Sequence, residues 1–533
     1  MNKKIILIVV TLCVTVSLQA QITQEQKTRM LNDIERFGRA LISVSTNYID
    51  TVNTTAIVDR AIADMFQSLD PHSTYIPAKD LQAVNEPLDG SFQGIGIEFA
   101  IMKDTLVVQS TVSGGPSEAV GLRGGDRIIK VDGVDISGGT LSNAKVHSCL
   151  RGPKGTKVDV GVLRRGLTDT LYFTITRDAI PLNSVDASYL SNGIVYVKLG
   201  RFAMNTIDDL VEAFKVTKYY PKGVILDLRG NTGGFLHSAL MVSDFFLSRG
   251  QTILYSEGLN TPKREEAATG QGPYQNGPMV VLIDENSASA SEIVAGALQD
   301  WDRAIIVGRR SFGKGLVQQS FPLDDGSELR LTIARYHTPT GRVIQSPYRE
   351  GHSKDYYQAA YDRLERGEPF HRDSIHFPDS LKYQTLKQHR TVYGGGGIMP
   401  DVFVPMDTTG YSPYYLSLVS RGLINDYVNQ YCDDHRAQLK KQYPDFTQFD
   451  KKYSLEKELF YGMVQYASEH GLPSDQLQID SSQRLIKVVL KALVARSLFG
   501  TTGYYHVINN ENDGAFQKAV EIIEHWPSTF PSL

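Results

Sequence analysis

The chain has 533 residues, of which 41% are hydrophobic and 21% are charged. These values are typical of a globular protein of three or four domains and exclude a largely disordered chain. A net charge of -4 gives no electrostatic basis for binding nucleic acid, so no nucleic-acid partner is expected.

The first twenty residues carry the features of a secretory signal. Two lysines precede an apolar run from Ile5 to about Val16, and Ala20 supplies a small residue at the expected cleavage position. The run is short for a transmembrane helix, although an uncleaved anchor stays open as an alternative. We therefore predict a signal peptide over residues 1–20 and a secreted chain.

Two different patterns follow the signal. Residues 21–88 place apolar side chains at helical spacing and predict an N-terminal helical region. Residues 89–178 change to short strands and glycine turns. There, Gly94-Ile95-Gly96-Ile97 offers bare backbone N–H groups to a carboxylate, and a short helix and a tight turn follow. This order resembles a PDZ domain, which captures a peptide C-terminus as an added strand; another small β-rich module is the alternative.

Residues 179–346 alternate strands and helices, which predicts an α/β core with a largely parallel sheet. One strand ends at Leu228 and runs into a loop with Gly233 and Gly234, and a second ends at Ile283, shortly before Ser289. Because parallel sheets bind ligands where strands give way to helices, we expect the chemistry at these loops.

The remainder of the chain shows no pattern that predicts chemistry. Residues 347–393 are polar and rich in charge and tyrosine, which indicates an insertion. Residues 394–409 would complete the core, and the glycine run that begins this segment is typical of a flexible hinge. Residues 410–533 return to helical spacing and predict a C-terminal helical region.

Three serines compete for the role of a nucleophile: Ser287, Ser289 and Ser291. Ser289 stands at a predicted strand-to-helix turn, where a hydroxyl can be presented to a substrate. It also forms a capping box with Glu292, and a capping serine in most proteins only satisfies backbone donors. The local pattern leaves both interpretations open.

Backbone donors for an oxyanion are available beside Ser289. The N–H of Ala290 would point outward with the positive end of the helix dipole. A second donor could come from Gly233 or Gly234, because adjacent glycines let the backbone approach a ligand. A plain strand-to-helix turn is the alternative for the glycine pair.

Lys314 follows in a loop between Gly313 and Gly315. A lysine can take a proton from a serine only when it is neutral, and burial favours that state; an exposed surface lysine is the alternative. The segment from Gly308 to Lys314 also fits the G-x-x-x-x-G-K phosphate loop, but Gly315 stands where that motif needs Ser or Thr. We expect no nucleotide or other cofactor and, without tight histidine spacing, no metal.

Together these residues resemble the carboxyl-terminal processing peptidases, a family of tail-specific serine proteases with a PDZ domain. The matching segments lie in order along the chain and are Asp70–Ser73, the PDZ segment, Asp227–Gly234, Ser287–Ile293, Phe312–Gln318 and Gly397–Asp401. The resemblance implies an α/β protease core of the crotonase-like (ClpP/crotonase) type, with the PDZ domain inserted and helices on either side.

The resemblance also implies roles for individual residues. The implied catalytic residues are Ser289 as nucleophile, Lys314 as general base and Gln318 as the residue that orients the lysine. The implied oxyanion donors are Gly233 and Ala290. The implied contacts to the substrate's tail are Gly94, Ile95, Gly96, Ile97 and Arg151. Asp300 matches an acidic position that takes part in some members, with a structural role as the alternative.

We therefore predict a serine endopeptidase of the periplasm or cell envelope, secreted across the inner membrane, that binds C-terminal tails through its PDZ domain. Its partners would be protein or peptide substrates with free apolar C-termini; a membrane-proximal location and a homo-oligomer stay open. One alternative is a catalytically silent PDZ scaffold or chaperone, which the intact Ser289, Lys314 and Gln318 disfavour. Another is a crotonase-like acyl-CoA enzyme, which the signal and the PDZ segment disfavour.

Overall fold

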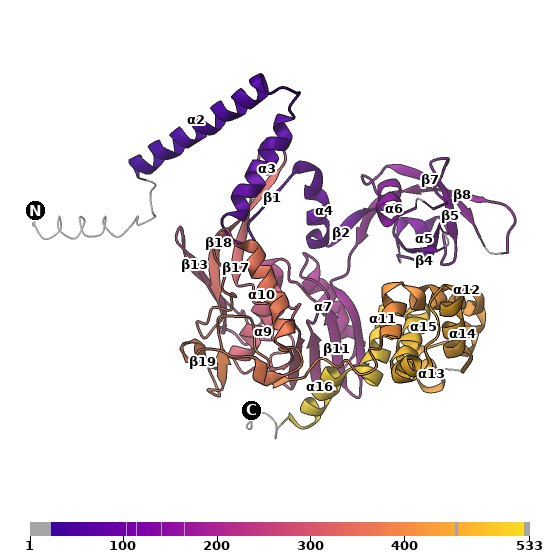
Figure 1. The fold of residues 1–533 in the computed structure, drawn as a ribbon. Coiled ribbons are helices and arrows are strands. Elements are labelled where there is room, and N and C mark those ends of the chain that lie inside the picture. Colours follow the sequence, from indigo (N-terminus) through magenta and orange to yellow (C-terminus); the bar gives the residue numbers. More distant parts are fainter. Residues whose placement is uncertain are drawn as a thin grey trace, which may run out of the picture.

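The computed structural model describes residues 23–102, 104–112, 114–139, 141–164, 166–453 and 457–526. The predicted signal peptide, residues 1–20, lies outside these ranges. Among the helices in the described part of the chain, none combines the length and the apolar character needed to cross a membrane. Figure 1 shows N-terminal helices, a β-rich domain, an α/β core and a cluster of C-terminal helices.

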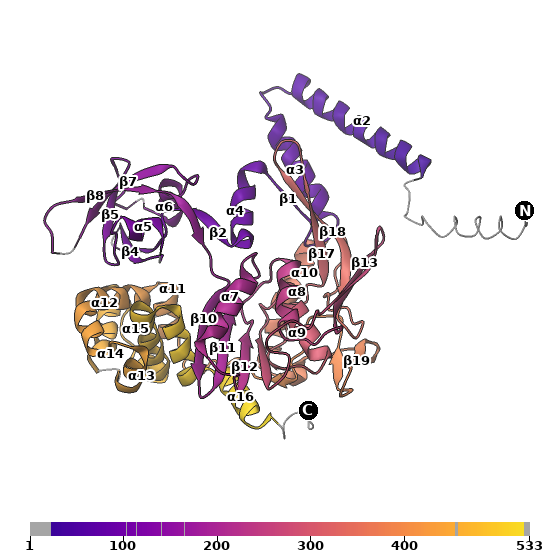
Figure 2. The same cartoon turned by 180° about the vertical axis from the view of Figure 1, so that it is seen from behind.

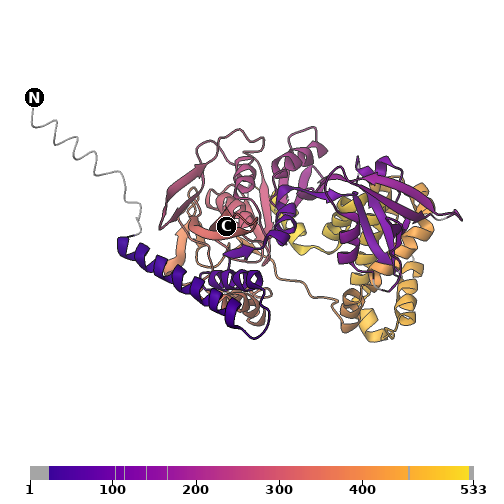
Figure 3. The same cartoon turned by 90° about the horizontal axis from the view of Figure 1, so that it is seen from above.

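The N-terminal region contains the predicted helices α2 (Gln24–Asn47), α3 (Thr54–Gln67) and α4 (Ala78–Asp89), with the short strand β1 (Thr74–Ile76) between the last two. Helix α2 extends away from the rest of the molecule in Figures 1 and 3. It buries none of its residues, although its apolar side chains keep helical spacing.

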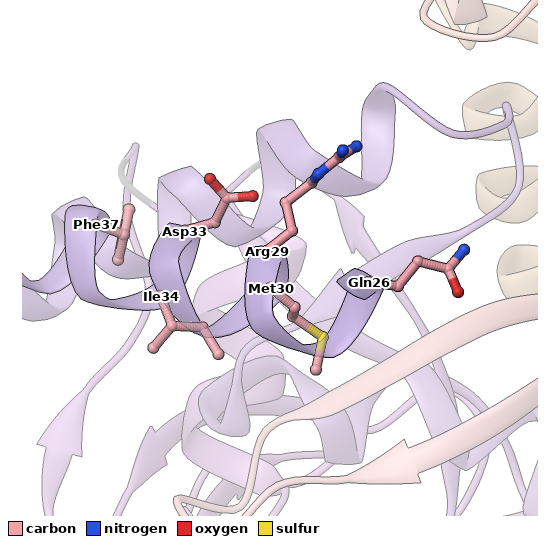
Figure 4. Close-up of a pocket in the computed structure, with 6 residues that line it drawn as sticks. All are labelled: Gln26, Arg29, Met30, Asp33, Ile34 and Phe37. Atoms are coloured by element: carbon pink, nitrogen blue, oxygen red, sulfur yellow. The ribbon is translucent and has the colours of Figure 1, made fainter. Parts of the chain in front are cut away.

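The apolar face of α2 is therefore uncovered. Met30, Ile34 and Phe37 are 48%, 60% and 49% exposed. Figure 4 labels these three side chains on α2, where they line a pocket together with Gln26, Arg29 and Asp33. An amphipathic helix of this kind usually buries its apolar face against a partner.

The β-rich domain is a sheet in the order β3-β4-β5-β7-β8, with β6 paired to β5. Its elements are β3 (Ile97–Met102), β4 (Thr105–Thr111), α5 (Pro116–Ala119), β5 (Arg127–Val131), β6 (Val134–Asp135), α6 (Asn143–Leu150), β7 (Lys157–Leu163) and β8 (Leu171–Thr176). Two strands, β2 (Ser91–Gly94) and β9 (Asp178–Pro181), pair and connect the domain to the core. Strand β3 ends the sheet, so among the described residues one of its edges is unpaired.

The core is a six-stranded sheet in the order β10-β11-β12-β15-β16-β21, antiparallel between β10 and β11 and parallel thereafter. Its strands are β10 (Val185–Ser191), β11 (Ile194–Leu199), β12 (Gly223–Asp227), β15 (Met279–Ile283), β16 (Ile305–Gly308) and β21 (Val402–Phe403). The connections supply α7 (Thr206–Ala213), η1 (Phe214–Val216), α8 (Leu236–Asp244) and α9 (Ala290–Asp300). Every residue of β12 and β15 is buried, as expected for parallel strands covered on both faces.

A second sheet joins the start of the chain to the core. It has the order β1-β18-β13-β14, with β17 also paired to β18. Its remaining strands are β13 (Thr252–Gly258), β14 (Thr261–Ala267), β17 (Leu316–Pro322) and β18 (Glu328–His337). Strands β1 and β17 pair with opposite edges of β18, and the side chain of Gln318 on β17 reaches the turn before β1.

The C-terminal region contains α11 (Pro413–Ser420), α12 (Leu423–Gln442), α13 (Phe446–Lys452), α14 (Lys457–Glu469), α15 (Gln476–Asn512) and α16 (Gly514–Glu524). Helix α16 leaves this group and packs on β12, β15 and β16, as Figure 2 shows. It buries Phe516 and Ile523 against the sheet, and Asp513 pairs with Arg229 at 2.7 Å. The helical pattern alone did not predict that the chain returns to complete the core.

The segment from 347 to 393 forms α10 (Ser353–Glu365), η2 (Arg372–Ser374), η3 (Asp379–Leu381) and the hairpin of β19 (Lys382–Gln384) and β20 (Thr391–Tyr393). The glycine run after it is not a free hinge, so that expectation was wrong. Gly395 N donates to Val343 O at 2.6 Å, and Gly397 N donates to Ile344 O at 2.7 Å. A Cβ added to Gly313 would lie 3.0 Å from Gly397 N, so the glycines allow close packing behind residues 309–315, the loop between β16 and β17 that carries Lys314 and that we call the lysine loop.

Candidate active site

The structure separates the three competing serines. The buried hydroxyls of Ser287 and Ser291 donate to the carbonyls of Leu228 and Asn231, at 2.9 and 2.8 Å. Both therefore tie the strand-to-helix turn to the loop after β12. Ser289 instead lines an open pocket of about 570 Å³.

Ser289 has an unusual backbone, with φ 55° and ψ -113° immediately before α9. A non-glycine residue in such a conformation costs roughly 1–3 kcal/mol, which the surrounding contacts must offset. Ala288 N donates to Asn231 O at 3.1 Å, and Ser289 N donates to Glu292 Oε2 at 2.9 Å. These bonds fix the turn that presents the serine to the pocket.

The same pocket contains Lys314 and Gln318, so the structure brings the three predicted catalytic residues together. Lys314 Nζ donates to Gln318 Oε1 at 3.3 Å. Burial lowers the pKa of Lys314, while the carboxylates of Glu292 and Asp70 oppose this shift. The lysine is thus a partly desolvated group inside a cavity and not an exposed surface side chain.

The phosphate-loop alternative does not fit this geometry. Gly313 N and Lys314 N donate to the Glu292 carboxylate at 2.7 and 2.8 Å, so the protein's own carboxylate occupies the donors that a phosphate would need. The chain then enters strand β17, whereas a phosphate loop leads into a helix.

The turn before β1 supports Gln318, which sequence reasoning did not anticipate. Gln318 Nε2 donates to the carbonyl of His72. Asp70 holds this turn by accepting from His72 N at 2.8 Å and from Ser73 N at 2.9 Å. Asp70–Ser73 is one of the segments on which the family resemblance rests, but nothing in the sequence indicated which residue it would contact.

The side chain of His72 points to the segment expected to be an insertion. Its Nε2 lies 3.2 Å from the hydroxyl of Tyr356 on α10, and that hydroxyl also lies 3.3 Å from Gly313 O. Burial, assisted by the charge of Lys314, lowers the pKa of His72 to about 4, so the ring is neutral near pH 7. Helix α10 therefore contacts both the turn that contains His72 and the lysine loop.

The predicted oxyanion donors lie beside the serine. A Cβ added to Gly233 would lie 2.8 Å from Ser289 Cβ and 3.0 Å from Ala290 N. Ala290 and Gly234 line the pocket. The N–H of Gly233 donates to Asn231 Oδ1 at 2.9 Å in this conformation, so it is engaged within the loop.

Asp300 takes a structural role instead. Its Oδ2 accepts from Thr340 N at 2.9 Å, and its carboxylate pairs with the buried Arg342 at 2.7 Å. It does not line the pocket around Ser289. Of the two roles that the sequence left open for Asp300, the structure supports the structural one.

The predicted tail-binding loop has its carbonyls turned into the β-rich domain. Ile95 O accepts from Ser117 N at 3.1 Å, and Gly96 O accepts from Val112 N at 3.0 Å. In a trans peptide the N–H points opposite to the preceding C=O, so the N–H groups of Gly96 and Ile97 point away from these partners. The loop leads directly into the unpaired edge of β3.

Arg151 lies where the β-rich domain meets α4. It pairs with Glu86, and its guanidinium lies 4.9 Å from the centre of the Phe92 ring. Asn85 and Leu88, from the same helix as Glu86, line the pocket around Ser289. Helix α4 therefore contacts Arg151 and the candidate active site at once.

Three segments of the chain match known protein families. Residues 193–356 match peptidase family S41, residues 93–175 match the PDZ domain, and residues 414–500 match a family of unknown function.

A carboxy-terminal-processing protease of Bartonella bacilliformis is 39% identical over 356 residues, which are 65% of this chain and 81% of that protein. The carboxy-terminal processing protease CtpA of Bacillus subtilis is 33% identical over 323 residues, 60% of this chain and 68% of that protein. Among solved structures, the photosystem II D1 C-terminal processing protease is 27% identical and covers 69% of this chain and 92% of its own, with a TM-score of 0.35.

This chain covers 81% and 68% of these two relatives at more than 30% identity, and the family matches span most of the β-rich domain and the segment that contains Ser289, Lys314 and Gln318. The chain therefore belongs to the carboxy-terminal processing proteases of peptidase family S41, and it is a serine-type peptidase with a PDZ domain.

Proposed function

We propose that the protein is a secreted endopeptidase of the cell envelope that binds protein C-terminal tails through its PDZ domain and cleaves with Ser289 and Lys314. One observation carries the proposal: a desolvated lysine, hydrogen-bonded to Gln318, shares a pocket with a serine held at φ 55°. The features of residues 1–20 support secretion, and the parallel core sheet with α8 and α9 supports a crotonase-like core.

In the proposed mechanism, neutral Lys314 takes the proton of Ser289 as its Oγ attacks the substrate carbonyl. Ala290 N–H and Gly233 N–H stabilise the oxyanion, which requires Gly233 to exchange Asn231 for the substrate. The protonated lysine then returns the proton to the leaving amine, and water releases the acyl group by the same route. Gln318 keeps the lysine amine in place throughout.

Substrate capture would occur at the PDZ domain. The N–H groups of Gly96 and Ile97 would bind the terminal carboxylate, and the tail would pair with the open edge of β3. Arg151 lies beside the start of this loop, since a Cβ added to Gly94 would lie 3.8 Å from Arg151 Cγ, and its partner Glu86 is on α4, which lines the active-site pocket. Helix α4 would thereby transmit the effect of tail binding to the active-site pocket.

Blocking the substrate's terminal carboxylate tests this proposal. An unfolded reporter with an apolar C-terminal tail should be cleaved at least about tenfold faster with a free carboxylate than with an amidated one, because the amide removes the charged group of the tail. The measurement is initial rate by mass spectrometry of the products. Equal rates for the two reporters would contradict tail recognition, and no cleavage of either would contradict the peptidase assignment to this substrate class.

We further propose that the protein is a homodimer in which α2 packs against α2 of a second copy. The uncovered stripe of Met30, Ile34 and Phe37 supports a self-complementary helix pair. Ile34→Asp should convert the dimer to a monomer, because it places a charge in the apolar contact, whereas Asn32→Asp on the opposite side of the helix should not. Light scattering after gel filtration gives the masses, and a wild-type monomer would refute the pairing.

A further inference from the structure

The main chains of the two proposed catalytic residues meet at one buried carboxylate. Glu292 Oε2 accepts from Ser289 N at 2.9 Å and from Lys314 N at 2.8 Å. Its other oxygen accepts from Ser311 Oγ at 2.5 Å and from Gly313 N at 2.7 Å. Three of the four donors belong to the loop that carries Lys314, so helix capping alone does not account for them.

A buried tyrosine makes the matching contacts on the carbonyl side. The hydroxyl of Tyr336, on β18, donates to Lys314 O at 2.7 Å and lies 3.3 Å from Ser289 O. Helix α9, the lysine loop and β18 are thereby joined around the dyad. We call Glu292 and Tyr336 the dyad clamp.

Burying a carboxylate is costly unless its lone pairs are satisfied. The Glu292 side chain is fully buried, and this burial raises its pKa to about 7 in spite of four hydrogen bonds. The fold thus keeps an expensive group at the only described point where the N–H groups of both proposed catalytic residues converge. A simple helix cap would need only the contact to Ser289 N.

We propose that Glu292 and Tyr336 are positioning residues that fix the distance and orientation between Ser289 and Lys314. This inference rests on the proposed Ser289–Lys314 dyad. Neither residue exchanges a proton with the substrate; they act by holding the main chain of both residues. A misplacement of about 1 Å between reacting groups can cost about a hundredfold in rate.

The clamp also makes a prediction about pH, because Glu292 faces the lysine. The charges of Glu292 and Asp70 raise the pKa of Lys314, whereas burial and Arg330 lower it, and the neighbouring His72 is neutral near pH 7. Removing the charge of Glu292 removes one of the two raising influences. The pKa of Lys314 should then fall, and activity should rise at lower pH than in the wild type.

The groups that face Glu292 itself come from several elements. Besides its four hydrogen-bond donors and Tyr336, they are Tyr356 and Arg363 of α10. The tyrosines remain protonated because burial raises both of their pKa values. Arg363 is paired with Glu368, so we expect its position and positive charge to stay the same in a Glu292 variant.

The experiment compares Glu292→Gln with Asp401→Asn, using steady-state cleavage across pH. Asp401 is a matched control because its carboxylate is also buried and accepts from a backbone donor, Ile306 N at 2.8 Å, outside the pocket. We expect kcat of Glu292→Gln to fall about a hundredfold or more with KM within about threefold, and its pH midpoint to move down. Asp401→Asn should keep the wild-type midpoint.

Tyr336→Phe and Tyr274→Phe provide a second, independent pair. Both tyrosines are buried and donate to a carbonyl, but Tyr274 bonds Pro278 O outside the pocket. Tyr336→Phe should lower kcat about tenfold or more without moving the midpoint, because no charge changes, and Tyr274→Phe should match the wild type. If Glu292→Gln does not fold, this pair of variants tests whether the clamp positions the dyad.

The outcomes separate the clamp from the dyad. Wild-type kcat and midpoint in Glu292→Gln, with Lys314→Ala inactive, would show that Glu292 only caps α9 and would overturn the proposal. If kcat of Glu292→Gln falls but the midpoint of its pH profile does not move, the prediction that Glu292 raises the pKa of Lys314 would be overturned. Activity retained in Lys314→Ala would instead refute the proposed function.

Discussion

Replacing Lys314 with alanine is expected to lower kcat for tail cleavage by ~10³-fold or more, and Ser289→Ala by ~10⁴-fold or more. The first change removes the base and the second removes the nucleophile. Because such residues act as a unit, the loss of either one removes nearly the whole rate enhancement. The double variant should be no slower than the slower single variant. Rates are measured with an unfolded reporter that carries an apolar tail, and folding is followed by thermal melting.

Two neighbouring serines provide matched controls for the nucleophile. Ser287→Ala and Ser291→Ala remove buried hydroxyls that bond Leu228 O and Asn231 O, so each leaves a buried acceptor with one donor fewer. We expect each to cost about 1–3 kcal/mol of stability while retaining most of the activity. Full activity of Ser289→Ala would show that Ser289 is not the nucleophile. The same conclusion would follow if only a control variant were inactive although it folds.

Gly233→Ala should lower kcat by ~10²-fold or more. The added Cβ would lie 2.8 Å from both Ala288 O and Ser289 Cβ, so the serine or the glycine loop must move. Either movement misplaces the nucleophile relative to Ala290 N–H, and one misplaced oxyanion donor typically costs 10²–10³-fold in kcat. Steady-state kinetics with a short peptide substrate measures the effect.

Gly230→Ala in the same loop is the control. Gly230 has φ 69°, but an added Cβ would meet nothing within 4 Å. Both variants therefore bear a backbone strain of about 1–3 kcal/mol, and only Gly233→Ala bears the clash. Equal kcat in the two variants would show that backbone strain alone explains the effect. The packing of Gly233 against Ser289 would then not contribute to catalysis.

The sequence allowed the candidate dyad to be located because its signals are local. Ser289 follows a buried strand and precedes a helical pattern, Lys314 lies between glycines, and Gln318 follows four residues later. The helical, PDZ and α/β regions were likewise visible from their periodicity and turn residues. The local pattern alone left three serines open, and the family resemblance favoured Ser289. The structure adds that Ser287 and Ser291 donate to carbonyls of the loop after β12, which the sequence did not indicate.

The contacts that hold the dyad could not be predicted, because they join segments far apart in the chain. The carbonyl of His72 accepts a hydrogen bond from Gln318 Nε2. The hydroxyl of Tyr356 contacts Gly313 O in the lysine loop, although Tyr356 belongs to a segment that looked like a polar insertion. The tyrosine content of that segment was a signal, but it did not indicate a target. Glu292 was visible only as half of a capping box, and its bonds to Gly313 and Lys314 require the folded loop.

Seating α16 on the core sheet also bears on self-digestion. A protease meets folded copies of itself as well as its substrates. Here the stretch from Gly514 to Glu524 is helical, and it is held by the buried Phe516 and Ile523 and by the Arg229–Asp513 ion pair. This stretch becomes an extended substrate only when the sheet is uncovered, so attack on it by another copy is limited by how often the core opens.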